Sequence, residues 1–149
     1  MNRQERMRLR GEQGSAIVEF VFLGVLMMVP LVYLVMSVGR VQAGSYAVTT
    51  AAREAGRAFV TAGAAEDAAG RARAAAEIAF ADQGFGSSGG LAISCSATPC
   101  LSPDARVETT ARVTVPLPLI PAFARDVVPL EIPLSASHLS TIDRFRAAP

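Results

Sequence analysis

The stretch GSAIVEF, residues 14–20, opens the one long apolar run of this chain. From Ala16 to Val38 the run holds 23 residues, and Glu19 is its only charged one. A helix of that length covers about 34 Å, which is enough for a hydrocarbon core of roughly 30 Å. A carboxylate inside lipid is costly and is usually kept for a function. The run therefore predicts a transmembrane helix with a functional residue, Glu19, near its start.

The leader of residues 1–14 sets the orientation of this helix. It carries four Arg and two Glu, so it is net basic. By the positive-inside rule the N-terminus lies in the cytoplasm and everything after Arg40 lies outside it. The apolar run is longer than a secretory signal core of about 7–15 residues. Cleavage by signal peptidase after Ala43, which would leave Gly44 as the new N-terminus, stays open as an alternative.

Pro30 interrupts the apolar run. A proline inside a helix removes one backbone hydrogen bond, and membrane helices tolerate it when neighbouring groups satisfy the freed carbonyl. We expect a kink between Leu26 and Pro30.

Beyond the membrane the helical pattern continues from Val41 to about Ala62. Small residues recur every fourth position, which allows close approach of another backbone but also arises by chance in an alanine-rich helix: Gly39, Ala43, Ala47, Ala51 and Ala55. Arg53 and Arg57 are expected on a solvated face. Gly63 predicts a break, and a second helix is expected from Glu66 to Gln83.

The Gly- and Ser-rich stretch 84–90 predicts a flexible turn, after which apolar residues alternate with polar ones. Three strands are expected, over Leu91–Ala97, Val107–Val115 and Leu130–Ser137, antiparallel and with one face covered by helix. The fold class is therefore α+β. Pro133 favours an edge position for the last strand. The apolar, proline-broken stretch 116–123 connects the second and third strands, either packed within the domain or meeting the membrane or a partner.

These patterns divide the chain into four regions: a cytoplasmic leader 1–14, a transmembrane helix 15–39, an outer helical region 40–83 and a strand-rich region 84–149. A formal net charge of +1 gives no electrostatic reason to expect nucleic-acid binding.

Cys95 and Cys100 are the two cysteines. Outside the cytoplasm they are expected to form a local disulfide, with two free thiols as the alternative. One histidine and two cysteines do not supply a Cys/His zinc site. His138 is the only histidine, and Ser135, Ser137, Ser140 and Asp143 lie too close to it in sequence to form a catalytic triad on one strand. We therefore expect no enzyme, no cofactor, no metal and no small-molecule substrate.

The junction RGEQG at 10–14, followed by SAIVEF and an apolar helix, resembles the class III signal of type IV pilins and pseudopilins. In that family a prepilin peptidase cuts after the glycine. The resemblance implies a cut between Gly14 and Ser15, which makes Glu19 the fifth mature residue with the aromatic Phe20 after it. Gly14 suits a tight protease cleft, because it has no side chain to obstruct entry. Glu19 can pair with the freed amine of a neighbouring Ser15 and so fix the register between subunits. The alternative for Glu19 is an acid placed in a first helical turn, where the helix dipole favours it.

Residues 14–59, which include AAREAGR at 51–57, are similar to the TadE-like proteins of tight-adherence (Tad) pilus systems. This similarity implies a membrane-anchored pseudopilin or minor pilin, since the chain is larger than the short major pilins of these systems. The implied partners are a prepilin peptidase, other Tad pilins and pseudopilins, and the inner-membrane assembly platform. Pro30 departs from the family pattern, in which a proline often follows the Glu-Phe pair closely. Whether the protein enters the filament or stays in the membrane complex is left open by this departure. A type II secretion pseudopilin and an uncleaved, signal-anchored envelope protein with a binding domain are the alternatives.

Overall fold

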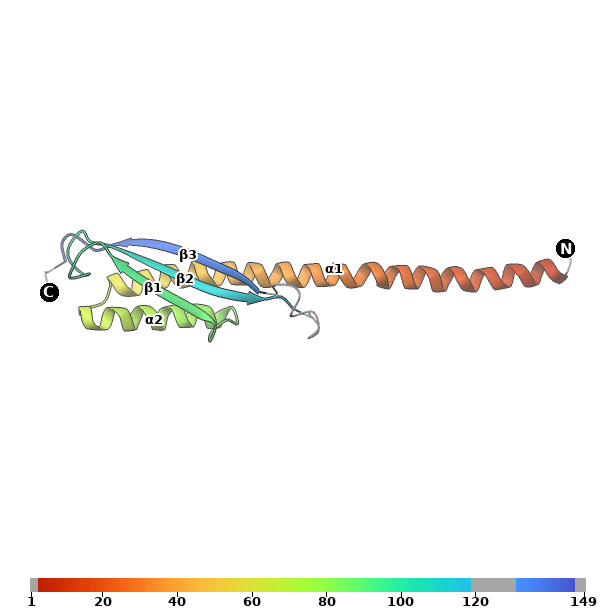
Figure 1. Cartoon of the computed structure of the whole chain (residues 1–149), viewed down its shortest axis with the longest axis horizontal. Helices are drawn as coiled ribbons and strands as arrows, with labels where there is room; N and C mark the ends of the chain where they lie inside the picture. The colour runs from red at the N-terminus through yellow and green to blue at the C-terminus, as the bar shows by residue number, and fades with distance from the viewer. Residues whose placement is uncertain (1–2, 119–130, 147–149) are drawn as a thin grey trace. The chain divides into compact units, whose positions relative to one another are not determined.

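The computed structural model describes residues 3–118 and 131–146, and the side chains from Ala16 onward (Figure 1). Its elements follow one another along the chain as α1 (Arg3–Val60), α2 (Ala65–Asp82), β1 (Gly89–Cys95), β2 (Arg106–Pro116) and β3 (Glu131–Thr141). The predicted α+β class is confirmed. The chain divides into two compact units, Met1–Val38 and Gly39–Pro149, which are described separately below. In the predicted connection 116–123, residues 119–123 lie outside the described part of the chain.

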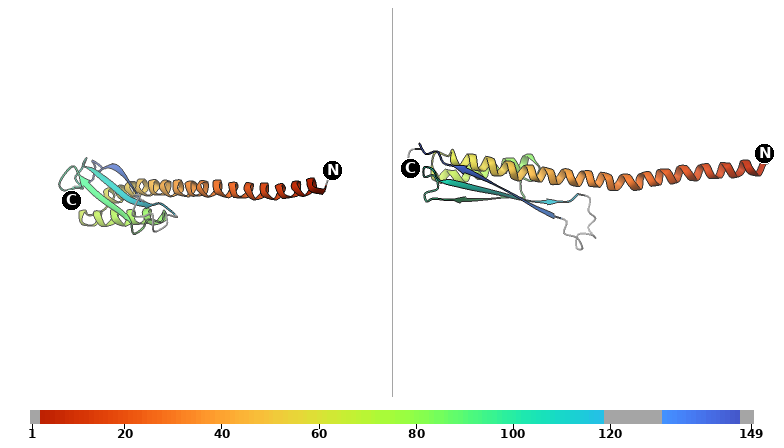
Figure 2. Two further views of the ribbon diagram at one scale, coloured as in Figure 1. Left: turned by 45° about the vertical axis from the view of Figure 1, so that its right-hand side comes forward. Right: turned by 90° about the horizontal axis from the view of Figure 1, so that it is seen from above.

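The three strands form one antiparallel sheet in the order β1-β2-β3. Ala111 of the central strand lies opposite Leu91 on one side and Ala136 on the other. The edge position predicted for the last strand from Pro133 is confirmed, because among the described residues β3 pairs with β2 alone. Within the unit 39–149, one face of this sheet lies against α2 and the second half of α1 (Figure 2).

The core of this unit is built from small side chains of α1 and branched side chains of β2. Ala47, Ala51 and Ala55 are fully buried, and so are Val107 and Val115. The ladder of small residues in the sequence therefore allows the backbone of a sheet to pack close to the helix. Because a β-strand presents a flat row of side chains, alanines on the facing helix let the two backbones approach closely.

Two glycines of α1 continue this close contact. A Cβ at Gly56 would lie 2.6 Å from Oγ of Ser140 and 3.1 Å from Oγ1 of Thr109. A Cβ at Gly44 would collide with the side chain of Val115 and lie 2.9 Å from Cδ1 of Leu134. A Cβ at either position would force these neighbouring side chains to shift, so both positions favour glycine, although glycine weakens a helix interior.

The outward face of α1 behaves as predicted, since Arg53 and Arg57 are exposed. The break expected near Gly63 is also present, between Val60 at the end of α1 and Ala65 at the start of α2. Arg146, close to the C-terminus, donates a hydrogen bond of 2.9 Å to the carbonyl of Val60 and further bonds to those of Ala62 and Gly63. A side chain far along the sequence thus satisfies carbonyls that the end of a helix leaves without partners.

Three predicted strand boundaries are wrong. The first strand was expected to end at Ala97 but ends at Cys95. Gly89 and Gly90 were expected in a turn but begin β1. A Cβ at Gly89 would collide with the ring of Phe80, so glycine is needed where α2 crosses the start of this strand. The last strand was expected to end at Ser137 but runs to Thr141, because β2 supplies pairing partners up to Arg106.

The helix α1 also begins earlier than expected, at Arg3 instead of Ser15. From Arg3 through Gly14 the backbone is therefore helical and continuous with the apolar run. Helical propensity of the Arg, Glu, Gln, Met and Leu residues in the leader accounts for this extension.

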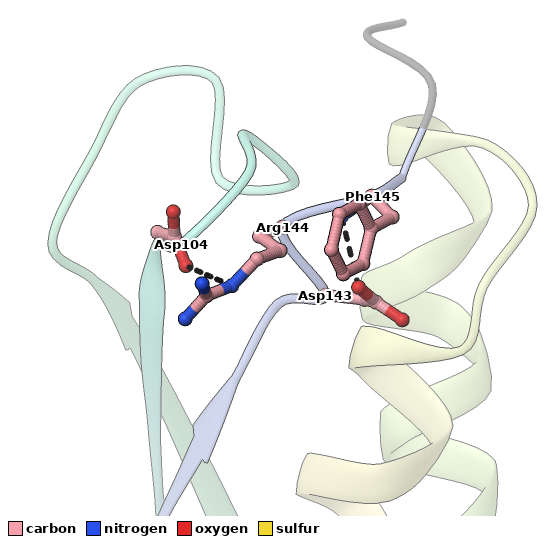
Figure 3. Close-up of polar contacts among 4 residues, drawn as sticks. All are labelled: Asp104, Asp143, Arg144 and Phe145. Carbon is pink, nitrogen blue, oxygen red and sulfur yellow. Dashed lines mark hydrogen bonds and ion pairs between the residues drawn. The ribbon is translucent and has the colours of Figure 1, made fainter.

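The residues that follow β3 pack against the end of the sheet at which β3 ends. The backbone N–H of Ile142 donates a hydrogen bond of 2.8 Å to the carbonyl of Ala105, and the Ile142 side chain is buried. Asp143 then accepts a hydrogen bond of 2.9 Å at Oδ1 from the N–H of Phe145 (Figure 3). Arg144 and Asp104 form an ion pair of 3.9 Å between side chains that are each 69% exposed. An exposed pair at this distance adds little to stability.

Candidate processing and assembly segment

The apolar part of α1, from Ala16 to Val38, exposes its large side chains in all directions. Fourteen of them lie between Ile17 and Leu34, with exposed fractions between 47% and 77%, and they are Ile17, Val18, Phe20, Val21, Phe22, Leu23, Val25, Leu26, Met27, Met28, Val29, Leu31, Val32 and Leu34. Among the described residues α1 is the one helix long and apolar enough to cross a membrane. A helix that is apolar all round needs a lipid or protein environment on every side.

Glu19 is exposed and is the only ionisable group of this apolar surface apart from the phenol of Tyr33. Phe20 beside it is 77% exposed. Glu19 forms no ion pair with any residue that the structure describes. Both side chains can thus contact lipid or protein outside the unit 1–38.

Gly14 and Ser15 lie within α1, and their positions are described by the backbone alone. Ser15 and Glu19 are four positions apart, so the helix places them on the same face, one turn apart. The helix brings this pair together, while Gly14 lies one residue further back. The predicted processing and pairing roles of these residues stay predictions.

Pro30 lies inside α1, which continues through it. Proline has no N–H to donate to the carbonyl of Leu26, one turn earlier. This missing bond is the physical basis of the predicted kink, which stays a prediction.

The unit 39–149 begins directly after the apolar run. The guanidinium of Arg40 lies 4.9 Å from the centroid of the Phe85 ring, and that ring is buried. A cation over an aromatic face is attracted by the electrons of the ring. Arg40 therefore ties the first turn of α1 in this unit to the turn after α2, a contact that the sequence did not indicate.

The cysteines are joined as predicted: Cys95 and Cys100 form a disulfide across a five-residue separation, with their Cα atoms 5.4 Å apart. Cys95 ends β1, and Leu101, directly after Cys100, is almost completely buried. The bridge thus holds a core side chain next to the end of an edge strand.

The polar residues considered for catalysis are distributed over both faces of β3. His138 is half-buried on the face toward α1, whereas Ser135 and Ser137 are exposed on the other face. Asp143 lies beyond the strand and bonds to Phe145. Among the described residues no group of three His, Cys, Asp or Glu side chains is close enough to hold a metal ion.

The structure adds residues that sequence reasoning missed. Arg146, Gly44 and Phe85 each act through a contact between segments far apart in the sequence. A glycine in the middle of an otherwise regular helical pattern was the one available signal, and it applied to Gly44 and Gly56.

Comparison with known proteins adds one finding. The model of the TadE-like protein family matches residues 14–57. The match begins at Gly14 and ends at Arg57, so it covers the apolar run and the helix that packs on the sheet. Comparisons with curated proteins and with solved structures give no match. Over residues 14–57, the chain is therefore similar to the TadE-like proteins.

Proposed function

We propose that this protein is a membrane-anchored pseudopilin or minor pilin that takes part in assembly of a Tad-type pilus. The observation that carries the proposal is the TadE-like match over residues 14–57, which begins at the glycine of the GSAIVEF junction. The exposed apolar surface of residues 16–38 supports it, since such a surface has to be covered by lipid or by other helices. The same helix serves as a membrane anchor before assembly and as a packing surface during assembly.

Processing by a prepilin peptidase after Gly14 is the first step of the proposal. Net positive charge in the leader keeps this junction on the cytoplasmic side and leaves the unit 39–149 outside. Because α1 includes Gly14, the helix has to unwind locally before an extended backbone reaches the peptidase. Glycine makes this unwinding easier, since it has the lowest helical preference after proline.

Glu19 has the second role. Cutting after Gly14 creates a positively charged amine on Ser15, and Glu19 provides the carboxylate that neutralises it in lipid. We place this pair between neighbouring subunits, where it sets the axial register of their helices. Phe20 packs beside it. In the apolar region an unpaired carboxylate costs several kcal/mol more than a paired one, so pairing between subunits favours assembly.

The partners of this function are a prepilin peptidase, other Tad pilins and pseudopilins, and the inner-membrane assembly platform. The protein acts as a subunit and not as an enzyme. A pseudopilin of a type II secretion system is the second candidate, because it shares the Gly-to-Glu junction. An uncleaved, signal-anchored envelope protein with an outer binding domain is the third.

The test is to express the full chain with its prepilin peptidase in a membrane and to sequence the mature N-terminus. A start at Ser15 is expected. A start at Gly44, or an intact leader, contradicts the proposal. Gly14→Leu is expected to block cutting, while Gly11→Leu, which changes a second glycine of the same leader, is expected to permit it.

Assembly is tested separately with Glu19→Ala. This variant is expected to be cut normally and to be lost from isolated pili or from complexes with other pilins. Glu12→Ala removes an acid from the leader and serves as the matched control. Normal assembly of the Glu19→Ala protein would exclude the pairing role while leaving the processing step intact.

A further inference from the structure

The edge strand β1 lacks the features by which proteins prevent pairing with other chains. Its sequence GGLAISC, residues 89–95, contains no charge and no proline. The opposite edge strand, β3, contains Glu131 and Pro133. Charged residues, proline and bulges are the usual protections of an exposed edge, so β1 is the edge open to a further strand. Figure 1 shows β1 at the side of the sheet nearest to α2.

The hydrogen-bond pattern identifies the backbone groups that this edge offers. The N–H of Ser96 donates to the carbonyl of Arg106 over 2.9 Å, so these opposed residues form a bonded pair. Bonded and non-bonded pairs alternate in an antiparallel ladder. Leu91 and Ile93 therefore direct their N–H and C=O groups away from β2, and none of the residues that the structure describes hydrogen-bonds to them outside the ladder.

The side chains of the same two residues border an apolar groove. Leu91 and Ile93 of β1 face Ala65 and Ala69 of α2 across a cavity of about 380 Å³. The remaining residues of its lining are Phe59, Arg73, Cys95, Cys100 and Leu101. Leu91 and Ile93 are half-buried, unlike the fully buried Val107 and Ala111 of the central strand. An added strand would place alternate side chains over this groove and cover both residues.

Arg73 determines which charge a segment bound in this groove should carry. It is the one charged residue of the lining, it is exposed, and it forms no ion pair with any other described residue. A groove with apolar walls and a single guanidinium favours an apolar segment that carries a carboxylate.

We propose that the free edge of β1 is a docking site for an extended segment of a partner protein, which adds a strand to the sheet. Alternate apolar side chains of this segment cover Leu91 and Ile93, and an acidic side chain on the same face pairs with Arg73. Main-chain hydrogen bonds supply affinity and the groove supplies specificity, as in other cases of strand addition. The site belongs to the outer unit and does not depend on the cut after Gly14.

The test uses the full chain in lipid nanodiscs and two fluorescent nine-residue peptides. Both peptides alternate valine and threonine, and the central valine is replaced by aspartate in one and by lysine in the other. The aspartate peptide is expected to bind at least about fivefold more tightly at low salt, since one exposed charge pair is replaced by a repulsive one. Arg73→Glu is expected to reverse this preference. Arg71→Glu, on the same helix but outside the groove, is expected to leave it unchanged.

Amide hydrogen exchange at single-residue resolution identifies the mode of binding. The bound peptide is expected to slow exchange at Leu91 and Ile93 and to leave Ala92, whose N–H already bonds to β2, unchanged. Ile93→Lys is expected to abolish binding, whereas Ala92→Lys, on the outer face, is not; exchange of the β2 amides verifies that both variants are folded.

Three results would overturn the proposal: binding of neither peptide, binding without slower exchange at Leu91 and Ile93, or equal effects of the two arginine reversals. Slower exchange at these residues that rises with protein concentration in the absence of peptide would also contradict it. That result would assign the edge to a second copy of this chain.

Discussion

The hydroxyl of Thr109, on the central strand, donates a hydrogen bond of 2.8 Å to the backbone carbonyl of Ala52 in α1. Thr109 is completely buried, and its oxygen also lies 3.1 Å from the carbonyl of His138 on β3. One side chain therefore connects the helix to two strands at the centre of the core. A hydroxyl buried in this way requires a partner, because an unsatisfied polar group would cost stability.

Replacing this hydroxyl tests how much the connection stabilises the unit 39–149. We expect Thr109→Val to lower the free energy of unfolding by about 1 kcal/mol, since the shape is kept and one buried hydrogen bond is lost. Thr110→Val is the matched control, because Thr110 shares an exposed hydrogen bond with Ser137 on the outer face. Exchange of the β2 amides measures both effects. Equal losses of unfolding free energy in the two variants would show that the buried hydrogen bond stabilises the unit no more than the exposed one does.

The glycines of the two helices are expected to respond in opposite directions to alanine. Gly56→Ala should destabilise the unit by about 1–3 kcal/mol, since a Cβ would overpack the core against Ser140 and Thr109. Gly70→Ala should stabilise it by about 0.5–1 kcal/mol, because Gly70 lies in α2 with nothing within 4 Å of the added atom. Thermal unfolding followed by circular dichroism compares the two. Stabilisation by Gly56→Ala would contradict the close approach of helix and sheet.

Arg146 is expected to stabilise the end of α1. Arg146→Ala should cost about 1–2 kcal/mol, since charged hydrogen bonds to the carbonyls of Val60, Ala62 and Gly63 are lost. Arg144→Ala is the matched control and should have little effect, because its ion pair with Asp104 is exposed. Exchange of the amides in the last turns of α1 measures the local effect. An equal response in both variants would mean that net charge, not the cap, is responsible.

The disulfide is expected to stabilise the unit 39–149 by about 2 kcal/mol, the value that the chain-entropy model gives for a loop this short. The double variant Cys95→Ser, Cys100→Ser should lose this amount in chemical unfolding. A reducing agent should lower the stability of the native chain to a similar level and leave the double variant unchanged. If reduction did not change the free energy of unfolding, the bridge would not contribute to stability.

Much of the fold was predictable because it follows from local patterns. The length of the apolar run, the position of its one charged residue Glu19, the change from helical to alternating periodicity and the edge position implied by Pro133 depend on neighbouring residues alone. So does the expected pairing of Cys95 with Cys100, which are too close in sequence to need the rest of the fold.

The remaining features depend on contacts between distant segments. The alternation at Leu134 and Ala136 was visible, but only pairing with β2 decides that the strand continues to Thr141. Glycine is a turn signal by itself, and only the pairing with Val113 shows that Gly89 lies in a strand, where the nearby ring of Phe80 explains the absence of a side chain.

The sequence by itself determined which residues form helices and strands, where a membrane span fits, and which junction resembles a processing site, because periodicity, length and charge are local properties. The tertiary structure alone decided that the small-residue ladder of α1 faces a sheet, that Thr109 bonds to Ala52 and that Arg146 caps the helix. It also decided that β1 has a free edge beside Arg73. Each of these depends on which surfaces meet, and a surface is complete only when segments far apart in the chain have packed.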